Sequence, residues 1–271
     1  MKRFAAVIII SYFVATISQA NLILSTTTTE TLGGFEMRNG DLVSYDPVTN
    51  RSTLFFSESL FRADEDIDAV SILGNGNIIL STTNNAILGG LSFKGGDLVE
   101  YNPLTNIASL FFNGSLLGNN KNIDAAYVRG NGNIILSTTS TVSLGGVSFH
   151  KDDLAEYNPT TMTASMFFDG SSYFDNSDEN IDAAYIFDNG NLLLSTSNNA
   201  TLGGLNFRSG DIVEFNPLTN TASIYFNQDL MNCYEENIDA VFMLNASVPE
   251  PATGVLLVIG ALMFARKRTS N

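Results

Sequence analysis

The segment from Ile123 to Thr138, IDAAYVRGNGNIILST, decides the fold of this chain. It begins with one apolar run, Ile123–Val128, and ends with another, Asn133–Thr138. Between them stands Asn131-Gly132, a pair typical of the tight turn of a β-hairpin, in which both central residues adopt φ > 0. The segment therefore predicts two antiparallel strands joined by a tight turn.

Two markers show that this unit is repeated. Ile-Asp-Ala occurs four times with spacings of 56, 58 and 57 residues, and its aspartates are Asp68, Asp124, Asp182 and Asp239. Leu-Gly-Gly also occurs four times with spacings of 56, 56 and 58 residues, starting at Leu32, Leu88, Leu144 and Leu202. Because both markers keep a common period, the chain is built from four structural repeats.

Each repeat contains four strand-like runs. In the repeat that opens at Ile123, a longer loop with Leu-Gly-Gly follows the hairpin and leads to a third run, Asp153–Tyr157. Asn158-Pro159 then opens a tight turn, because proline presets φ at the first corner, and a fourth run follows at Ala164–Phe168. The repeat is therefore predicted to be a four-stranded antiparallel sheet.

The strands at the two ends of the repeat region are informative about how the fold closes. The body of the chain starts with a segment, Asn21–Ser25, that corresponds to the second strand of a repeat. It ends with a segment, Ile238–Leu244, that corresponds to the first strand of a repeat. Pairing of these two strands would complete the first sheet and remove an open apolar edge. We predict an all-β fold, a four-bladed β-propeller over residues 21–246 closed by its terminal strands. The alternatives are an open repeat stack, which gives no reason for the shifted phase, and a larger ring made by dimerisation.

Parts of each repeat resemble the hemopexin-like four-bladed propeller family. The matching residues are Ile181-Asp182-Ala183-Ala184, Gly210-Asp211 and Phe215-Asn216-Pro217. The chain departs from that family in having no Trp, no bridging cysteines and an inserted Leu-Gly-Gly loop. The resemblance implies four blades and no particular function.

The first twenty residues have the features of a secretory signal peptide. Lys2 and Arg3 precede an apolar run that ends in Ser18-Gln19-Ala20, with small residues at the positions that signal peptidase recognises. We expect cleavage after Ala20.

The tail, residues 247–271, contains a short motif, an apolar segment and a basic cluster. The motif is Val248-Pro249-Glu250-Pro251, the apolar segment covers about 252–265, and Arg266-Lys267-Arg268 follows. The segment is short for a permanent span, which needs about 20 apolar residues. This order resembles the PEP-CTERM sorting signal of Gram-negative bacteria. The resemblance implies processing by an exosortase, a transient membrane anchor through a short C-terminal transmembrane helix, and placement at the cell surface or in the extracellular matrix, often alongside exopolysaccharide.

Composition excludes several classes of function. Residues 21–250 carry 8 basic and 28 acidic side chains, a net charge of −20, which disfavours nucleic acid and anionic lipid surfaces. The single cysteine, Cys233, cannot form an internal disulfide. The single histidine, His150, excludes most hydrolytic triads and His-based metal sites.

The repeated aspartates are the candidate metal ligands. Asp68, Asp124, Asp182 and Asp239 would stand on the four innermost strands and approach the axis near one mouth, and oxygen-bearing side chains stand two residues earlier, at Asp66, Asn122, Asn180 and Asn237. Such oxygen ligands suit Ca²⁺, so an axial calcium ion is one hypothesis. The other is that each aspartate caps its own tight turn by accepting backbone N–H bonds.

The sequence leaves two classes of function open. The near-identical blades favour an exported, non-enzymatic binding or structural module, and the candidate partner is exopolysaccharide. The alternative is an extracytoplasmic enzyme acting on polysaccharide, a lyase or a hydrolase. In either case the longer loops between the second and third strands, and between one repeat and the next, indicate the binding face.

Overall fold

The structure of the protein is a computed structural model that describes residues 20–119, 121–176, 179–231 and 237–244. The expected signal segment before Ala20, the tail with Val248-Pro249-Glu250-Pro251, and Cys233 lie outside the described residues. Within those residues, no helix has the length and apolar character needed to cross a membrane.

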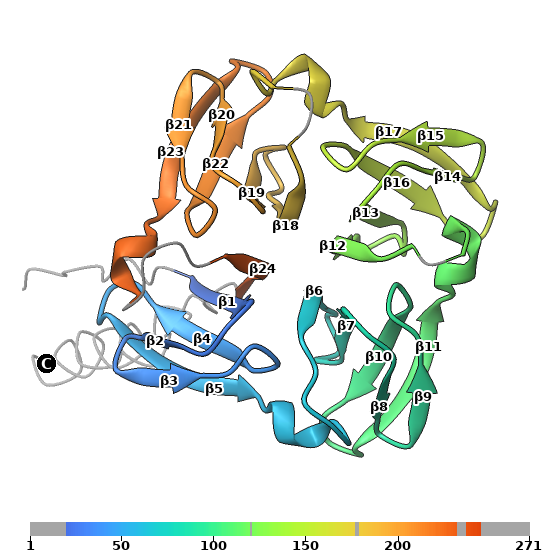
Figure 1. Cartoon of the computed structure of the whole chain (residues 1–271). Coiled ribbons are helices and arrows are strands. Elements are labelled where there is room, and N and C mark those ends of the chain that lie inside the picture. The colour runs from blue at the N-terminus through green and yellow to red at the C-terminus, as the bar shows by residue number, and fades with distance from the viewer. Residues whose placement is uncertain (1–19, 120, 177–178, 232–236, 245–271) are drawn as a thin grey trace, which may run out of the picture. The chain divides into compact units, whose positions relative to one another are not determined.

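Four four-stranded antiparallel sheets surround a central axis and confirm the predicted four-bladed propeller (Figure 1). From the axis outward, blade 1 contains β24 (Ile238–Leu244), β1 (Asn21–Thr26), β4 (Leu42–Asp46) and β5 (Arg51–Phe56). Blade 2 contains β6 (Ile67–Ile72), β7 (Ile78–Thr82), β10 (Leu98–Asn102) and β11 (Ile107–Phe112). Blade 3 contains β12 (Ile123–Val128), β13 (Ile134–Thr138), β16 (Leu154–Asn158) and β17 (Thr163–Phe168). Blade 4 contains β18 (Ile181–Ile186), β19 (Leu192–Thr196), β22 (Ile212–Asn216) and β23 (Thr221–Phe226).

The terminal strands close the ring as predicted. β1 pairs with β24 in antiparallel register, with Asn21 opposite Leu244 and Leu24 opposite Val241. This pairing gives blade 1 its innermost strand and leaves no blade with three strands. The open stack is therefore excluded for this chain.

Aromatic contacts link each blade to the next. The last residue of every outermost strand is a buried phenylalanine that meets an aromatic ring of the third strand of the following blade, edge to face. The pairs are Phe56–Tyr101 at 5.6 Å, Phe112–Tyr157 at 5.6 Å, Phe168–Phe215 at 5.9 Å and Phe226–Tyr45 at 5.7 Å between ring centroids. Such edge-to-face pairs add to the burial of the rings themselves. Because the fourth pair joins blade 4 to blade 1, the packing closes with the same fourfold order as the strands.

Each Leu-Gly-Gly segment forms a small two-stranded hairpin, whereas the sequence predicts a loop there. The hairpins are β2 (Glu30–Leu32) with β3 (Phe35–Met37), β8 (Ala86–Leu88) with β9 (Leu91–Phe93), β14 (Val142–Leu144) with β15 (Val147–Phe149), and β20 (Ala200–Leu202) with β21 (Leu205–Phe207). Their two glycines both have positive φ, as at Gly145 (+56°) and Gly146 (+90°). A Cβ atom on Gly145 would lie 2.4 Å from the backbone nitrogen of Ala164, so the hairpin packs directly on the outermost strand of its own blade.

Short 3₁₀ helices connect the blades. They are η1 (Glu58–Leu60), η2 (Gly114–Leu117), η3 (Gly170–Ser172) and η4 (Gln228–Leu230). The aspartate that directly precedes the third strand of each blade fixes these connections. Asp97, for example, accepts hydrogen bonds from the backbone N–H groups of Lys94 (2.9 Å) and Gly114 (2.7 Å). Asp41, Asp153 and Asp211 make the equivalent pairs of bonds, so these four carboxylates are structural.

Candidate functional site

The structure brings the four aspartates predicted as metal ligands together at the axis. We call Asp68, Asp124, Asp182 and Asp239 the axial ring. Each is the second residue of an innermost strand and is 6–8% exposed. In the strand pairings the residue before each aspartate and the residue after it are matched to consecutive positions of the partner strand, so the aspartate is the extra residue of a β-bulge. A bulge redirects a side chain, and here it places a carboxylate near the axis.

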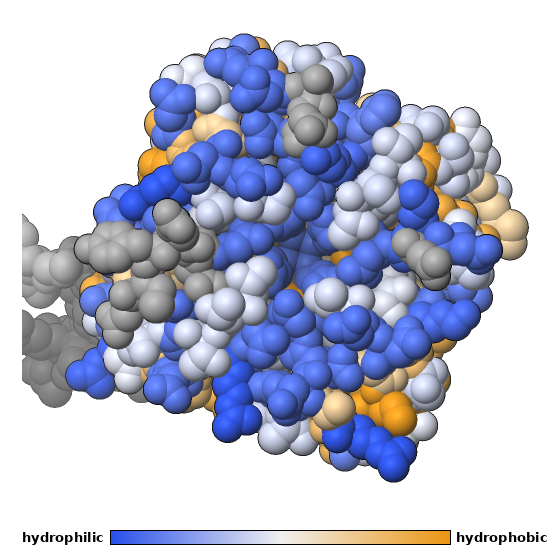
Figure 2. Space-filling view, in the orientation of Figure 1, coloured by the Kyte–Doolittle hydropathy of each residue, from blue (hydrophilic) through white to orange (hydrophobic). Residues whose placement is uncertain are grey.

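The centre of the face shown in Figure 2 is hydrophilic and hollowed. This agrees with the electrostatics of the axial ring, because the charge on each of the other three aspartates raises the pKa of Asp239. Such mutual influence requires the four carboxyl groups to be near one another.

Asparagine side chains of the neighbouring blade contact the axial ring. Asn122 of the segment before β12 donates a hydrogen bond of 2.5 Å to Asp68 of blade 2. Asn237 donates to Asp182 in the same way, from blade 1 to blade 4. A hydrogen bond from Asn180 lowers the pKa of Asp124.

Asp68 also accepts a hydrogen bond of 2.5 Å from the Thr83 hydroxyl. Within the described residues its partners are therefore side chains of other segments. This gives no support to the alternative that Asp68 caps its own turn through backbone N–H groups.

The boundary between blades 1 and 2 differs from the other three boundaries. Asp66 occupies the position that Asn122, Asn180 and Asn237 occupy elsewhere, and its charge raises the pKa of Asp239. The sequence alone shows that Asp66 replaces the asparagine of the other repeats. Its repulsion of Asp239 depends on the closed ring, which places these two residues of neighbouring blades near each other.

Burial is the first cause of the raised pKa values in the axial ring. The pKa is about 6 for Asp68, about 7 for Asp182 and about 8 for Asp124, and that of Asp239 lies well above its ordinary value. Hydrogen bonds from Asn122, Asn237 and Asn180 oppose these shifts but do not cancel them. The ring therefore binds protons at neutral pH, which reduces the repulsion between its carboxylates.

Several buried oxygens of this region accept no hydrogen bond from the described residues. They include the amide Oδ1 atoms of Asn122, Asn180 and Asn237 and the carboxylate Oδ2 atoms of Asp124 and Asp239. Among the described residues, no three carboxylate, histidine or cysteine side chains form a group that could hold a metal ion. A cation at the axis would therefore have to be bound by the asparagine oxygens as well as by carboxylates.

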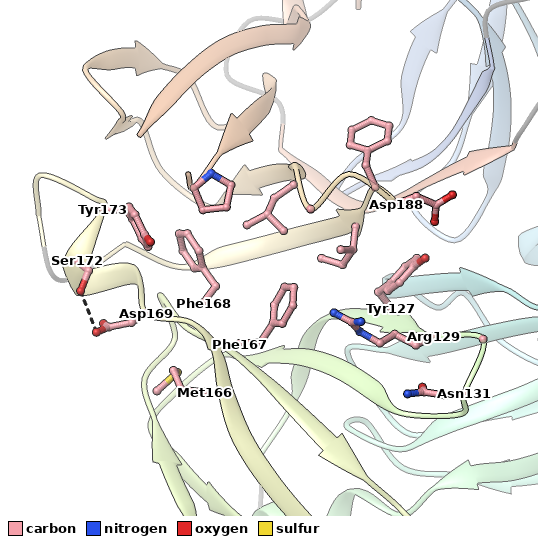
Figure 3. A pocket seen from close by; sticks show the side chains of 16 residues that line it. Tyr127, Arg129, Asn131, Met166, Phe167, Phe168, Asp169, Ser172, Tyr173 and Asp188 are labelled. Carbon is pink, nitrogen blue, oxygen red and sulfur yellow. Dashed lines mark hydrogen bonds between the residues drawn. The ribbon is translucent and has the colours of Figure 1, made fainter. Parts of the chain in front are cut away.

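A second candidate site is a cavity of about 710 Å³ between blades 3 and 4, which we call the inter-blade groove (Figure 3). Its lining includes Tyr127, Arg129, Phe167, Tyr173 and Asp188. It is bordered by the tight turns that follow β12 and β18 and by the start of the connection that contains η3. The sequence had indicated the face with the longer loops, whereas this groove uses side chains from both faces.

Arg129 and Tyr173 distinguish this groove from the other boundaries. Arg129 occupies the position of Leu73, Phe187 and Leu244 in the other blades. Its guanidinium carbon lies 5.1 Å from the centre of the Phe167 ring, and its Nε atom lies 3.5 Å from a carboxylate oxygen of Glu156.

Tyr173 occupies an extra position in the connection between blades 3 and 4. Phe174 forms an isolated β-bridge to Leu202 of the next Leu-Gly-Gly hairpin. In their own connections, Phe61 and Met231 form the equivalent bridges, but each lies one residue closer to the end of the preceding outermost strand. The Tyr173 ring stacks on Phe168 at 5.1 Å and 13°. The added residue thus places an aromatic ring at one end of the groove.

Comparisons with known proteins give the chain no family. No protein-family model matches it, and no curated protein matches it significantly. A structural genomics protein of unknown function from Bacteroides thetaiotaomicron is 10% identical with a TM-score of 0.36, over 72% of this chain and only 44% of that protein. A luciferin-regenerating enzyme is 10% identical with a TM-score of 0.38, over 79% of both chains. A chain of a nidogen/laminin complex is 7% identical with a TM-score of 0.41, over 81% of this chain and 98% of that one. Likenesses at this level carry no argument about function.

Proposed function

We propose that this protein is an exported module of the cell surface or extracellular matrix that binds a ligand without transforming it. One observation carries the binding role. The blades are near copies of one another, and two side chains at which blade 3 departs from them, Arg129 and Tyr173, border the same cavity of about 710 Å³ between blades 3 and 4. In a repeat protein the other blades show what the fold alone requires, so such departures point to a purpose beyond folding.

The two ends of the chain support export. The segment that ends at Ala20 has the pattern of a signal peptide, and Val248-Pro249-Glu250-Pro251 with its apolar and basic flanks has the pattern of an exosortase substrate. An exosortase-type processing enzyme and exopolysaccharide are the partners that follow from this proposal. The test is the mass of the secreted protein. It should correspond to a chain that begins at Asn21 and lacks the tail.

The groove favours binding over hydrolysis. Hydrolysis of a glycosidic bond needs a carboxylic acid whose pKa is raised so that it can protonate the leaving group. Asp169 in the groove has its pKa lowered by hydrogen bonds from the hydroxyls of Ser171 and Ser172. It is thus a poor proton donor at neutral pH.

A binding assay separates the module from the enzyme alternative. Residues 21–246 would be incubated with the exopolysaccharide of the producing organism, and both retention of the protein and the number of reducing ends would be measured. We expect retention on the polysaccharide with no new chain ends. Depolymerisation by either a hydrolase or a lyase would contradict the proposal, as would the absence of retention.

We also propose that Ca²⁺ binds at the axis. The buried amide oxygens of Asn122, Asn180 and Asn237 and the carboxylates of the axial ring are hard oxygen donors, which suit this ion. An ion would stabilise the folded state, since the unfolded chain has no such arrangement.

The melting temperature should rise when millimolar Ca²⁺ replaces a chelator. The Asp124→Asn variant should lose most of this rise. Asp46→Asn is the matched control, because Asp46 is a partly exposed carboxylate on the third strand of blade 1, away from the innermost strand, and asparagine already occupies its position in the other blades. An unchanged melting temperature of the unmodified protein would remove the calcium hypothesis.

A further inference from the structure

We propose that the inter-blade groove binds a neutral carbohydrate, an inference that rests on the proposed binding function and names its site and ligand class. A sugar ring has apolar C–H faces and a rim of hydroxyl groups. It therefore needs a site with exposed aromatic faces and with hydrogen-bonding groups at their edges. The inter-blade groove offers both.

The aromatic part of the site extends along the groove. Tyr127 contacts Tyr185 edge to face at 5.3 Å, and Phe167 lies under the guanidinium of Arg129. Tyr173 stands at the end of the groove remote from Arg129 (Figure 3). Each of these three rings is only partly buried, so a face or an edge remains accessible to a ligand.

The polar part comes from both blades. Arg129 and Asn131 belong to the turn after β12, and Asp188 belongs to the turn after β18. In Figure 3 the side chain of Arg129 extends toward Phe167, and Asp188 lies on the opposite side of the groove. Guanidinium, amide and carboxylate groups together provide donors and acceptors, which is what a ring of hydroxyl groups requires.

The charges favour a neutral ligand over an acidic one. Arg129 is the basic residue in the lining, and its charge is already matched by Glu156. Asp169 and Asp188 add two carboxylates, and residues 21–250 carry a net charge of −20. A uronic acid polymer would meet this negative field, and the described lining residues offer it no unpaired cation.

The size of the groove fits a short stretch of such a chain. Its volume of about 710 Å³ falls within the range of small-ligand sites, roughly 300 to 1,000 Å³. Blade 4 has an apolar counterpart of the Arg129–Phe167 contact, because Phe187 stands at the position of Arg129 and its ring lies 6.4 Å from that of Tyr225 on the outermost strand of the same blade.

The experiment uses residues 21–246, which include all four described blades from β1 to β24, and isothermal titration with neutral, uronic acid and amino-sugar oligosaccharides. We expect the neutral oligosaccharides to bind and the acidic ones not to bind. Arg129→Leu installs the residue of blade 2 and should fold, and Tyr173→Ser removes the added ring. Each should weaken binding about tenfold or more, which corresponds to about 1.4 kcal/mol.

Arg51→Leu is the matched control, since it removes an exposed arginine from blade 1 and should leave binding unchanged. Melting curves of all variants show whether the fold is kept. If the unmodified protein binds sugars and both groove variants bind equally well, the groove is the wrong site while the binding function stands. Tighter binding of charged sugars than of neutral ones overturns the ligand class, and no binding of any sugar overturns this inference together with a saccharide-binding function.

Discussion

The side-chain amide of Asn122 donates a hydrogen bond of 2.5 Å to the carboxylate of Asp68, across the boundary between blades 3 and 2. Two other boundaries have the same pairing of amide and carboxylate. At the boundary between blades 2 and 1, Asp66 stands in place of the amide, and its charge raises the pKa of Asp239. At this boundary a carboxylate thus faces a carboxylate, where the other three boundaries place an amide beside a carboxylate.

Replacing Asp66 by asparagine should stabilise the protein. The variant supplies the missing amide donor and removes a repulsive charge, so we expect a gain of about 1 to 2 kcal/mol, in line with a hydrogen bond to a charged group. For a domain of this size that is a rise of roughly 2–4 °C per kcal/mol in melting temperature, measured in the presence of a chelator. Asn122→Asp is the opposite change and should lower the melting temperature. A lower melting temperature for Asp66→Asn would show that the interactions of the Asp66 carboxylate, such as the hydrogen bond from the Thr83 hydroxyl, outweigh its repulsion of Asp239.

The axial ring should make the protein more stable in mild acid than in mild base. The pKa values of about 6, 7 and 8 at Asp68, Asp182 and Asp124 exceed the ordinary value of 3.8, so between these values the folded state holds protons that the unfolded state has lost. The stability present at low pH is then lost as the pH rises through the folded values, with a slope of up to about 1.4 kcal/mol per pH unit for each group.

Denaturant unfolding without metal should therefore give a free energy of unfolding that falls between about pH 5 and pH 8. Asp124→Asn should flatten the upper part of this profile, because Asp124 has a folded pKa of about 8. A free energy that rises over the same range would contradict the burial of these carboxyl groups.

The period of the sequence was enough to predict the blades and their closure. Four copies of Ile-Asp-Ala fix four innermost strands, and the change of phase between Asn21–Ser25 and Ile238–Leu244 leaves these two segments to pair with each other. The sequence pattern does not predict the Leu-Gly-Gly hairpins, because strands of three residues are too short for an alternating pattern. Their signal was the glycine pair itself, which is a favoured two-residue hairpin turn.

The two candidate sites differ in how far sequence alone could reach them. Fourfold symmetry places equivalent aspartates near one axis, so the axial ring followed from the repeats. The groove did not, because Arg129 and Tyr173 come from two segments whose proximity depends on the packing of blade 3 on blade 4. A comparison of the repeats with one another contained the signal, since Arg129 stands among apolar equivalents and one residue is added beside Tyr173.

Met162→Asn should stabilise blade 3. Met162 has φ of +56° in the turn between β16 and β17, and the equivalent residues Asn50, Asn106 and Asn220 have nearly the same conformation. Asparagine tolerates this region better than methionine, for which it costs roughly 1–2 kcal/mol. In blades 1 and 2 the asparagine also accepts a hydrogen bond of 3.0 Å from the hydroxyl of Tyr45 or Tyr101, and Tyr157 stands at that position in blade 3.

We therefore expect a gain of about 1 kcal/mol for Met162→Asn. The control is Asn106→Met, which should cost about as much and also removes the partner of Tyr101. A thermal melt of both variants checks this pair of changes, and equal melting temperatures would contradict the conformational argument.

Joining the end of β24 to the start of β1 should leave the propeller intact. In blades 2, 3 and 4 a tight turn connects the innermost strand to the next one, and in blade 1 Leu244 lies opposite Asn21 with no such turn between them. A permuted chain would connect Leu244 to Asn21 through the turn sequence of blade 2 and would begin at Gly76, in an exposed turn. Because every strand keeps its neighbours, we expect the same circular dichroism spectrum and a melting temperature within a few degrees. A second permuted chain opened within β13, between Ile135 and Leu136, is the control and should unfold at a much lower temperature, since it breaks a fully buried strand. If both permuted chains were equally unstable, the pairing of β1 with β24 would not be what holds the ring closed.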